Sequence, residues 1–306
     1  MKEALVIGIV APSGYVTDLD ALNRVEAYFA ARGHRVVVDD EARLRWQRFA
    51  GKDAERIESL HRMFRRDDID LIMAARGGYG LSRMLDGIDY ALLARSGKLF
   101  VGHSDCTALQ LALWARAKAP SLAGPTACFD FGGKTVSEFT ERNFWAALSQ
   151  PHHRIAVNAP GQPQCTVTGM LWGGNLRTVT HLVGTPWFPA IEGGILFLED
   201  VFEHPYRVER MLLQLHHAGV LDRQAAILLG DFSGYKLQDN DGGYDLAAAI
   251  KYVRGKTRTP VLTGLPFGHI RDKASLPVGG TGSLTSSGEG WQLEMTHPAG
   301  PWQRLQ

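Results

Sequence analysis

The sequence predicts an α/β protein, with an N-terminal domain built on a parallel sheet and a C-terminal α/β domain with a β-rich tail. In the first half, short apolar runs alternate with stretches whose apolar residues have helical spacing, a pattern typical of parallel α/β sheets. The same alternation begins again after a segment rich in proline and glycine, and the tail from Ser275 is glycine-rich with strand-like stretches. We therefore expect two domains, 1–155 and 156–306.

The elements of the first half follow from this spacing, and a Rossmann-like or flavodoxin-like sheet is the arrangement we expect. Residues 5–10 form an apolar run that predicts a buried strand, and Leu22, Val25 and Phe29 mark the next helix, which Gly33 ends. The expected elements are strand 5–10, helix 18–32, strand 36–38, helix 53–66, strands 70–75 and 98–102, and helices 105–118 and 138–148.

A linker is predicted at 151–163, where prolines and a glycine interrupt the pattern. Beyond it, the clearest helix begins at Pro205, which suits a first helical position, and Gly219 follows its end. The expected elements are strand 169–172, a turn at 173–175, helix 176–183, strand 194–198, helix 205–217, strand 225–232, helix 246–254 and strand 261–265.

Composition excludes several classes of protein. The formal net charge of +1 argues against a nucleic-acid partner, because proteins that bind nucleic acids usually carry an excess of basic residues. The three cysteines (Cys106, Cys128 and Cys165) form no CxxC pair, so neither a disulfide framework nor a zinc site is indicated, and a reducing compartment fits. No apolar run approaches the roughly 20 residues that span a bilayer. We expect a cytoplasmic protein that acts on no membrane.

Four polar or glycine-rich features stand at the predicted ends of strands, where open α/β sheets form their sites. Of these, Ser104 lies between a strand and a helix, a setting that exposes a nucleophilic hydroxyl beside backbone N–H groups. The usual G-x-S-x-G pattern is not met, because Cys106 replaces the second glycine. Ser104 or Asp105 as a simple helix cap is the alternative interpretation. The four features are 76–80, 103–105, 199–200 and 268–269.

A serine nucleophile needs a base and an acid that orients the base. His269 and Glu199 are the candidates, and the chain order Ser…Glu…His matches that of α/β-hydrolases. A surface or capping histidine and a carboxylate at a helix start are the alternative interpretations. The stretch 76–80 lacks the spacing of a phosphate loop, so we favour an oxyanion-hole or substrate-wall role for it. The sequence shows no HExxH motif and no acidic cluster that would bind a metal.

Taken together, eight segments resemble the LD-carboxypeptidase family, the muramoyltetrapeptide carboxypeptidases, along nearly the whole chain. Each segment is weak evidence alone, but all of them in this order are specific. The segments are APSGY (11–15), RFAG (48–51), RGGYG (76–80), GHSD (102–105), LWGGNL (171–176), LED (198–200), EHPYRVERML (203–212) and GLPFGH (264–269).

The resemblance implies a triad of Ser104, Glu199 and His269, with the serine on the N-terminal domain and its partners on the C-terminal domain. It implies a cytoplasmic, cofactor-free enzyme, often a homodimer, that removes the terminal D-alanine from murein tetrapeptides during cell-wall recycling. The backbone N–H groups of Asp105 and of Gly77 or Gly78 are the expected oxyanion donors.

Substrate binding is predicted from side-chain chemistry. Arginine suits the free carboxylate of a carboxypeptidase substrate. Trp172 and Asn175 are expected to form a substrate wall, although a core tryptophan beside a turn fits equally, and Glu203 suits a substrate amine such as that of diaminopimelate or a helix N-terminus. The arginine candidates are Arg76, Arg83 and Arg207.

Two alternatives stay open at this point. A related serine peptidase would cleave peptidyl or aminoacyl nucleotide antibiotics and confer self-immunity; an extra aromatic loop for the nucleobase would favour it, and the sequence has no obvious insertion of that kind. A binding module with two α/β domains would hold a muropeptide without cutting it, although the complete set of three catalytic residue types argues against this.

Overall fold

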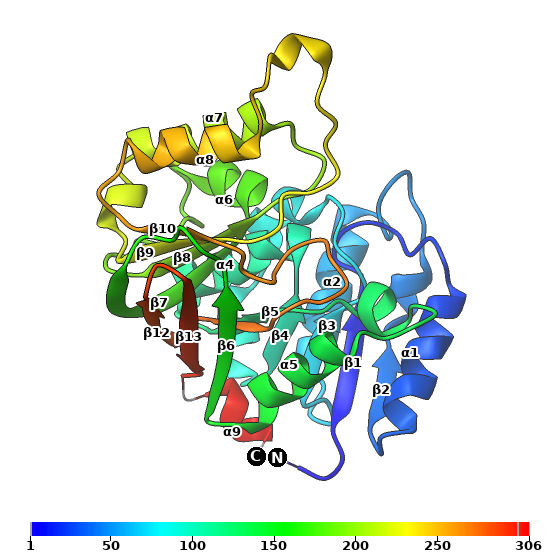
Figure 1. Ribbon diagram of the computed structural model, residues 1–306. Helices are drawn as coiled ribbons and strands as arrows, with labels where there is room; N and C mark the ends of the chain where they lie inside the picture. Colours follow the sequence, from blue (N-terminus) through cyan, green and yellow to red (C-terminus); the bar gives the residue numbers. More distant parts are fainter. Residues whose placement is uncertain (1, 299, 306) are drawn as a thin grey trace.

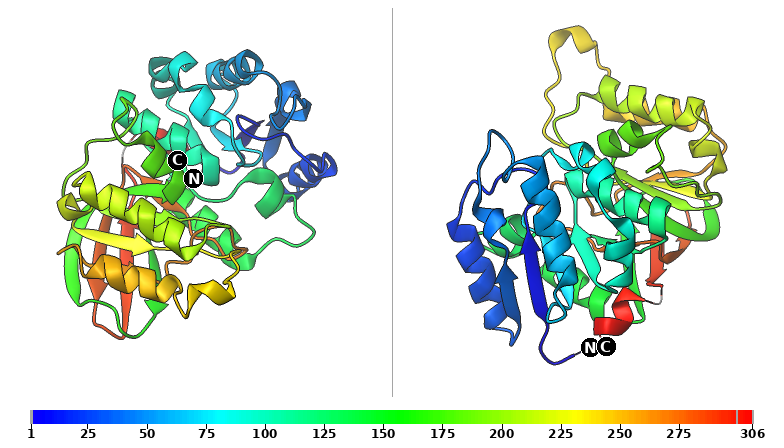
Figure 2. Two further views of the ribbon diagram at one scale, coloured as in Figure 1. Left: turned by 90° about the horizontal axis from the view of Figure 1, so that it is seen from above. Right: turned by 180° about the vertical axis from the view of Figure 1, so that it is seen from behind.

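The computed structural model describes residues 2–298 and 300–305, which fold around two mixed sheets (Figure 1). Each sheet takes most of its strands from one half of the chain. This confirms the predicted α/β class. The two ends of the described chain lie side by side, where the Lys2 N–H donates to the Leu305 carbonyl at 2.8 Å (Figure 2). No helix among the described residues is long and apolar enough to cross a membrane.

The first sheet has the strand order β11-β5-β4-β3-β1-β2. Strands β1 to β5 are parallel in the flavodoxin-like order 2-1-3-4-5, which confirms the predicted parallel sheet. Strand β11 comes from the C-terminal part of the chain and pairs antiparallel with β5. The bounds are β1 Val6–Val10, β2 Arg35–Val38, β3 Leu71–Ala74, β4 Leu99–Gly102, β5 Ser121–Ala123 and β11 Leu276–Val278.

Helices cover both faces of this sheet because the side chains of each strand alternate between them. Ile7 and Ile9 share one buried cluster with residues of α1, α5 and α9, whereas Val10 and Ile72 share the other with residues of α2, α3 and α4. The bounds are α1 Asp20–Ala30, α2 Asp53–Arg65, α3 Tyr90–Arg95, α4 Thr107–Ala117, α5 Glu138–Ser149 and α9 Pro301–Leu305.

The second sheet has the order β10-β9-β8-β7-β12-β13-β6. Strands β7 to β10 are parallel, and β12, β13 and β6 continue the sheet in antiparallel pairing. Helices α6, α7 and α8 lie together on one side of it in Figure 1. The bounds are β6 His152–Asn158, β7 Cys165–Asn175, β8 Ile195–Glu199, β9 Ala226–Leu229, β10 Val261–Thr263, β12 Thr281–Ser286, β13 Gly290–Thr296, α6 Leu176–Leu182, α7 Pro205–His217 and α8 Leu246–Arg254.

Two expectations from the sequence were wrong in detail. The segment expected to be a linker contains β6, which pairs with β13 along its whole length. The expected turn at 173–175 is the end of β7, because its glycines serve close approach rather than reversal. A Cβ on Gly173 would lie 1.9 Å from the Phe197 carbonyl oxygen, and one on Gly174 would lie 2.3 Å from Thr107 Oγ1. The division of the chain at residue 155 stays a prediction.

The two halves are joined by one core. A single buried cluster contains Leu111 of α4, Leu171 and Trp172 of β7 and Leu196 of β8. This packing brings the carboxyl end of β4, which precedes Ser104, close to the carboxyl end of β8, which is Glu199. The fold therefore assembles its site from residues of both sheets.

Candidate active site

Ser104 lies at a strained turn between β4 and α4. Its φ of 65° is in the left-handed region, which is uncommon for a residue other than glycine and is typical of a nucleophile elbow. The structure shows how Cys106 can stand in place of the second glycine of G-x-S-x-G. A Cβ on Gly102 would lie 2.7 Å from Cys106 Sγ, so the glycine at position 102 leaves the space that the cysteine side chain needs. Burial raises the pKa of the Cys106 thiol, which removes it as a competing nucleophile.

His269 connects Ser104 to Glu199. Its Nε2 lies 3.0 Å from Ser104 Oγ, and its Nδ1 lies 2.9 Å from Glu199 Oε2. Glu199 is fully buried at the end of β8, and its Oε1 accepts a hydrogen bond of 3.3 Å from the Asn175 amide. The three residues that the sequence predicted thus meet in one hydrogen-bonded row, with the carboxylate held on both sides.

Asp105 supports the turn rather than capping α4. Its carboxylate accepts hydrogen bonds from the Ser13 hydroxyl at 2.6 Å and from the Leu81 N–H at 2.9 Å. These bonds tie the segments after β1 and β3 to the residue that follows Ser104. Burial raises the pKa of Asp105, although the hydrogen bonds from Ser13 and Leu81 oppose that shift.

The glycine-rich stretch 76–80 lies against the serine. A Cβ on Gly77 would be 2.7 Å from Ser104 Cβ and 3.0 Å from its Oγ, so only glycine fits there. A Cβ on Gly78 would instead contact Gly14 at 3.4 Å. Gly77 therefore brings the backbone against the Ser104 side chain, and its oxyanion-hole role stays a prediction.

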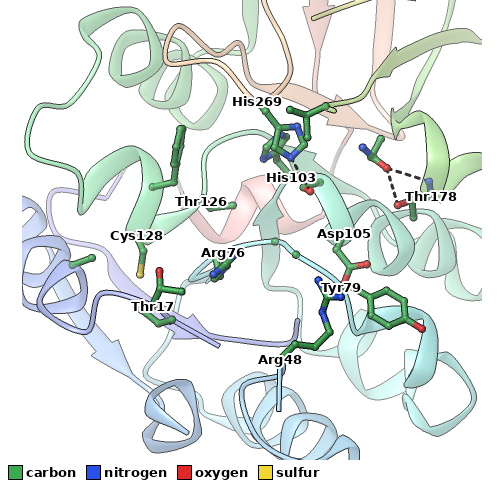
Figure 3. Close-up of a pocket in the computed structure, with 18 of the residues that line it drawn as sticks. Thr17, Arg48, Arg76, Tyr79, His103, Asp105, Thr126, Cys128, Thr178 and His269 are labelled. Carbon is green, nitrogen blue, oxygen red and sulfur yellow. Dashed lines mark hydrogen bonds between the residues drawn. The ribbon is translucent and has the colours of Figure 1, made fainter. Parts of the chain in front are cut away.

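The row opens onto a cavity of about 1250 Å³ that residues of both halves line. Figure 3 shows Arg48, Arg76 and Tyr79 across the cavity from His269. Arg24 and Arg177, which also line it, are paired with Asp18 and Asp200. Within residues 2–298 and 300–305, the lining residues Arg48, Arg76 and Lys134 have no carboxylate partner in an ion pair.

The predicted substrate-binding residues are only partly brought together. Arg76 and Asn175 line the cavity, although Asn175 also holds Glu199 and caps α6 through the Thr178 N–H. Trp172 does not line it, since its indole is 1% exposed and donates to Gln224 in the core.

The remaining charged candidates, Glu203, Arg83 and Arg207, do not line the cavity, and each is engaged in an ion pair. Glu203 pairs with Arg177 at 2.7 Å and with Arg207 at 3.7 Å, and Arg83 pairs with Asp53 at 2.8 Å. Of the three arginine candidates, Arg76 alone is among the residues that line the cavity.

The sequence reasoning missed a buried ion pair behind His269. Lys273 Nζ lies 3.1 Å from Asp130 Oδ1, and both side chains are almost fully buried. Asp130 belongs to the short helix Ala127–Phe131 of the first half and also accepts the Thr126 N–H. The pair therefore attaches the segment that follows His269 to the first half. A lysine four residues after His269 was the available signal, but nothing in the spacing pointed to Asp130.

A serine, histidine and glutamate in this geometry on an α/β scaffold are the arrangement of the serine-type hydrolases. Within that class, the chain belongs to the LD-carboxypeptidase family. The model of the family's N-terminal domain matches residues 7–124, and the model of its C-terminal domain matches residues 168–284. The resemblance inferred from the motifs is confirmed.

Individual relatives match over nearly their whole length. The murein tetrapeptide carboxypeptidase of Pseudomonas aeruginosa is 30% identical, with 93% of this chain and 94% of that protein covered. The crystal structure of muramoyltetrapeptide carboxypeptidase from Oxalobacter formigenes has 44% identity and a TM-score of 0.91, covering 96% of this chain and 100% of that one. The structure of MccF in complex with glutamyl sulfamoyl guanosine has a TM-score of 0.88 at 22% identity, with 97% of each chain covered, a likeness that shows the fold alone.

Proposed function

We propose that this chain is a murein tetrapeptide carboxypeptidase that hydrolyses the amide bond to the terminal D-alanine. The observation that carries the proposal is the row from Ser104 Oγ through His269 to buried Glu199, with contacts of 3.0 and 2.9 Å. Family membership and the names of the Pseudomonas and Oxalobacter relatives support this substrate. Cytoplasmic peptidoglycan recycling and a homodimer belong to the same proposal.

In the proposed mechanism His269 acts as general base and then as general acid. Its Nε2 takes the proton from Ser104 Oγ while the oxygen attacks the amide carbonyl. Glu199 accepts the Nδ1–H, which fixes the tautomer and stabilises the imidazolium. The imidazolium gives its proton to the nitrogen of the departing D-alanine, and water then releases the acyl group from Ser104.

Backbone N–H groups stabilise the negative charge of the tetrahedral intermediate. The N–H of Asp105, directly after the nucleophile, is one proposed donor, and the backbone at Gly77 supplies the second. Gly78 was an equal candidate from the sequence, but the closer contact of Gly77 with Ser104 favours Gly77. One such donor contributes about 3 kcal/mol to transition-state stability.

Arg76 is the proposed anchor for the substrate carboxylate. It lines the cavity beside Gly77, and its guanidinium donates one hydrogen bond to the Tyr15 carbonyl, which leaves other N–H groups for a bidentate contact. Arg83 and Arg207 are less suited because Asp53 and Glu203 already engage them.

Ser104→Ala tests the proposal directly. We expect release of D-alanine from a murein tetrapeptide to fall at least about a thousandfold, because the nucleophile is lost. Ser149→Ala, on α5 and outside the cavity, is the matched control and should keep the wild-type rate. A Ser104→Ala enzyme that turns over at the wild-type rate would exclude this mechanism. Tetrapeptide bound by the wild type and recovered intact would instead support a binding module.

The nucleotide-antibiotic alternative is separated by substrate. Purified wild-type protein is given the tetrapeptide and, in parallel, an aminoacyl sulfamoyl adenosine, and the products are identified by mass spectrometry. We expect D-alanine release from the tetrapeptide and no cleavage of the nucleoside compound. The reverse result would assign the chain to the alternative.

A further inference from the structure

His103 lies beside His269 and Glu199, and the proposed mechanism does not use it. Its ring centroid is 4.4 Å from that of His269, and its Nε2 is 4.0 Å from Glu199 Oε2. This Nε2 is buried and has no hydrogen-bond partner among the residues that the structure describes. Buried polar atoms are nearly always satisfied, so an unpartnered nitrogen directed at a carboxylate calls for a physical explanation.

His103 is buried beside the fully buried Glu199, so both side chains are shielded from bulk solvent. A neutral imidazole carries a free lone pair on one ring nitrogen, and this is the form in which histidine binds transition metals.

Three donors converge at this point. His103, Glu199 and His269 each offer one ligand atom, and these atoms all lie within 4.8 Å of one another. Two histidines and one glutamate form a ligand set that zinc uses in proteins, with water in the fourth position. A tetrahedral zinc ion with bonds of about 2.1 Å separates its ligand atoms by about 3.4 Å. The observed contacts of 2.9 Å (His269 Nδ1 to Glu199 Oε2) and 4.0 Å (His103 Nε2 to Glu199 Oε2) lie on either side of that value.

We propose that His103, Glu199 and His269 form an inhibitory zinc site at the active centre. The ring proton of His269 moves from Nδ1 to Nε2, and the zinc ion then binds the lone pair of that Nδ1, Glu199 Oε2 and His103 Nε2. Water from the cavity takes the fourth position, since His269 lines the cavity and its side chain is 25% exposed.

Zinc binding and catalysis are then mutually exclusive, a conclusion that rests on the proposed function. With its ring proton on Nε2, His269 has no free lone pair to accept the Ser104 proton, and Glu199 no longer orients the ring. His103 is the ligand that the catalytic reaction does not require, so it makes the site specific to metal binding.

The binding test uses the full-length Ser104→Ala protein, so that it does not depend on activity. Calorimetry with Zn²⁺ should give one site per chain, and Co²⁺ should give the absorption bands of a tetrahedral site. His103→Phe in the same background should weaken binding at least a hundredfold. His217→Phe is the matched control, because half-buried His216 and exposed His217 form the rival histidine pair away from the active site, and this variant should bind as the parent does.

His269→Ala in the same background is the second variant and should lose the site even if His103→Phe does not fold. Absence of a site in Ser104→Ala, or full binding in folded His103→Phe or His269→Ala, would overturn the proposal. These outcomes concern the metal site alone and leave the proposed carboxypeptidase function standing.

The activity test uses wild-type protein and tetrapeptide, with every rate normalised to the same protein in chelator. We expect at least tenfold inhibition at saturating Zn²⁺ and reversal on adding chelator. Folded His103→Phe should need at least a hundredfold more zinc. Stimulation by zinc would overturn the inhibitory role, and a protein that binds zinc but never cleaves tetrapeptide would overturn the proposed function while the site stood.

Discussion

At the residue scale, the environment of Glu199 determines what its carboxylate can do. It is fully buried, with one oxygen accepting from Asn175 and the other facing His269 Nδ1. Both contacts require an acceptor, so the site is matched to a carboxylate and not to an amide. This makes the charge of Glu199 testable without a change in shape.

Glu199→Gln should therefore lower kcat on tetrapeptide by about a thousandfold or more while the protein stays folded. The side-chain amide must present its NH2 to either Asn175 or His269, and facing His269 it imposes the wrong tautomer. Steady-state kinetics and circular dichroism check this. Glu138→Gln, an exposed residue of α5, is the control. A kcat within tenfold of wild type would show that the carboxylate charge is not needed.

Gly77 is the second residue whose position is restrictive. Gly77→Ala would place a methyl group 2.7 Å from Ser104 Cβ, so either the loop or the serine must move. We expect kcat/KM to fall at least about a hundredfold through loss of an oxyanion donor. Gly255→Ala, at the end of α8, is the control and should keep full activity. Normal activity in Gly77→Ala would remove this loop from the proposed oxyanion hole.

At the element scale, the segment that carries His269 is fixed by contacts with the first half. Besides the Lys273–Asp130 pair, the Thr140 hydroxyl accepts the Lys273 N–H at 2.8 Å, and Ser137 donates to Asp272 at 2.6 Å. The start of α5 and the helix Ala127–Phe131 thus hold a segment that belongs to the other half of the chain.

Lys273→Met should destabilise the protein by about 3–5 kcal/mol, because it leaves the Asp130 charge buried and unpaired. The double variant Lys273→Met/Asp130→Asn should recover most of that loss, since the amide oxygen still accepts from Thr126 and no buried charge remains. Denaturant unfolding measures both. Equal destabilisation of the single and double variants would show that charge pairing is not the reason for this contact.

At the scale of the whole molecule, several histidines couple stability to pH. Burial is the first cause of a lowered pKa at each of them, so the unfolded chain binds more protons than the native one when the pH falls below about 6.5. The resulting loss of stability begins at the unfolded pKa and grows until the native pKa is reached. The residues are His34, His61, His103, His153 and His297.

We expect the free energy of unfolding to decline from pH 7 to pH 5, and His103→Phe to decline less steeply. The difference between the two slopes should approach 1.4 kcal/mol per pH unit, the value for one proton. Asp39, whose pKa burial raises to about 6, acts in the opposite direction in both proteins and cancels in the comparison. Chemical denaturation at several pH values checks this, and parallel slopes would contradict it.

Local patterns in the sequence were sufficient to predict most elements, and the three residues that they singled out for the site lie within hydrogen-bonding distance of one another. Helix Pro205–His217 and helix Leu246–Arg254 have the bounds that spacing predicted, because their periodicity and end signals are local. Ser104, Glu199 and His269 were found because strand ends and family motifs are visible in one dimension, and their hydrogen-bonded row has the order that those motifs implied.

What only the tertiary structure decided were contacts between distant segments. Gly173 and Gly174 looked like a turn, yet they allow β7 to lie close to β8 and α4. Trp172 was expected to contact substrate but is in the core, and the partners of Lys273 and Arg83 could not be read from spacing. The physical reason is that backbone periodicity depends on neighbours along the chain, whereas pairing and burial depend on which surfaces the whole fold brings together.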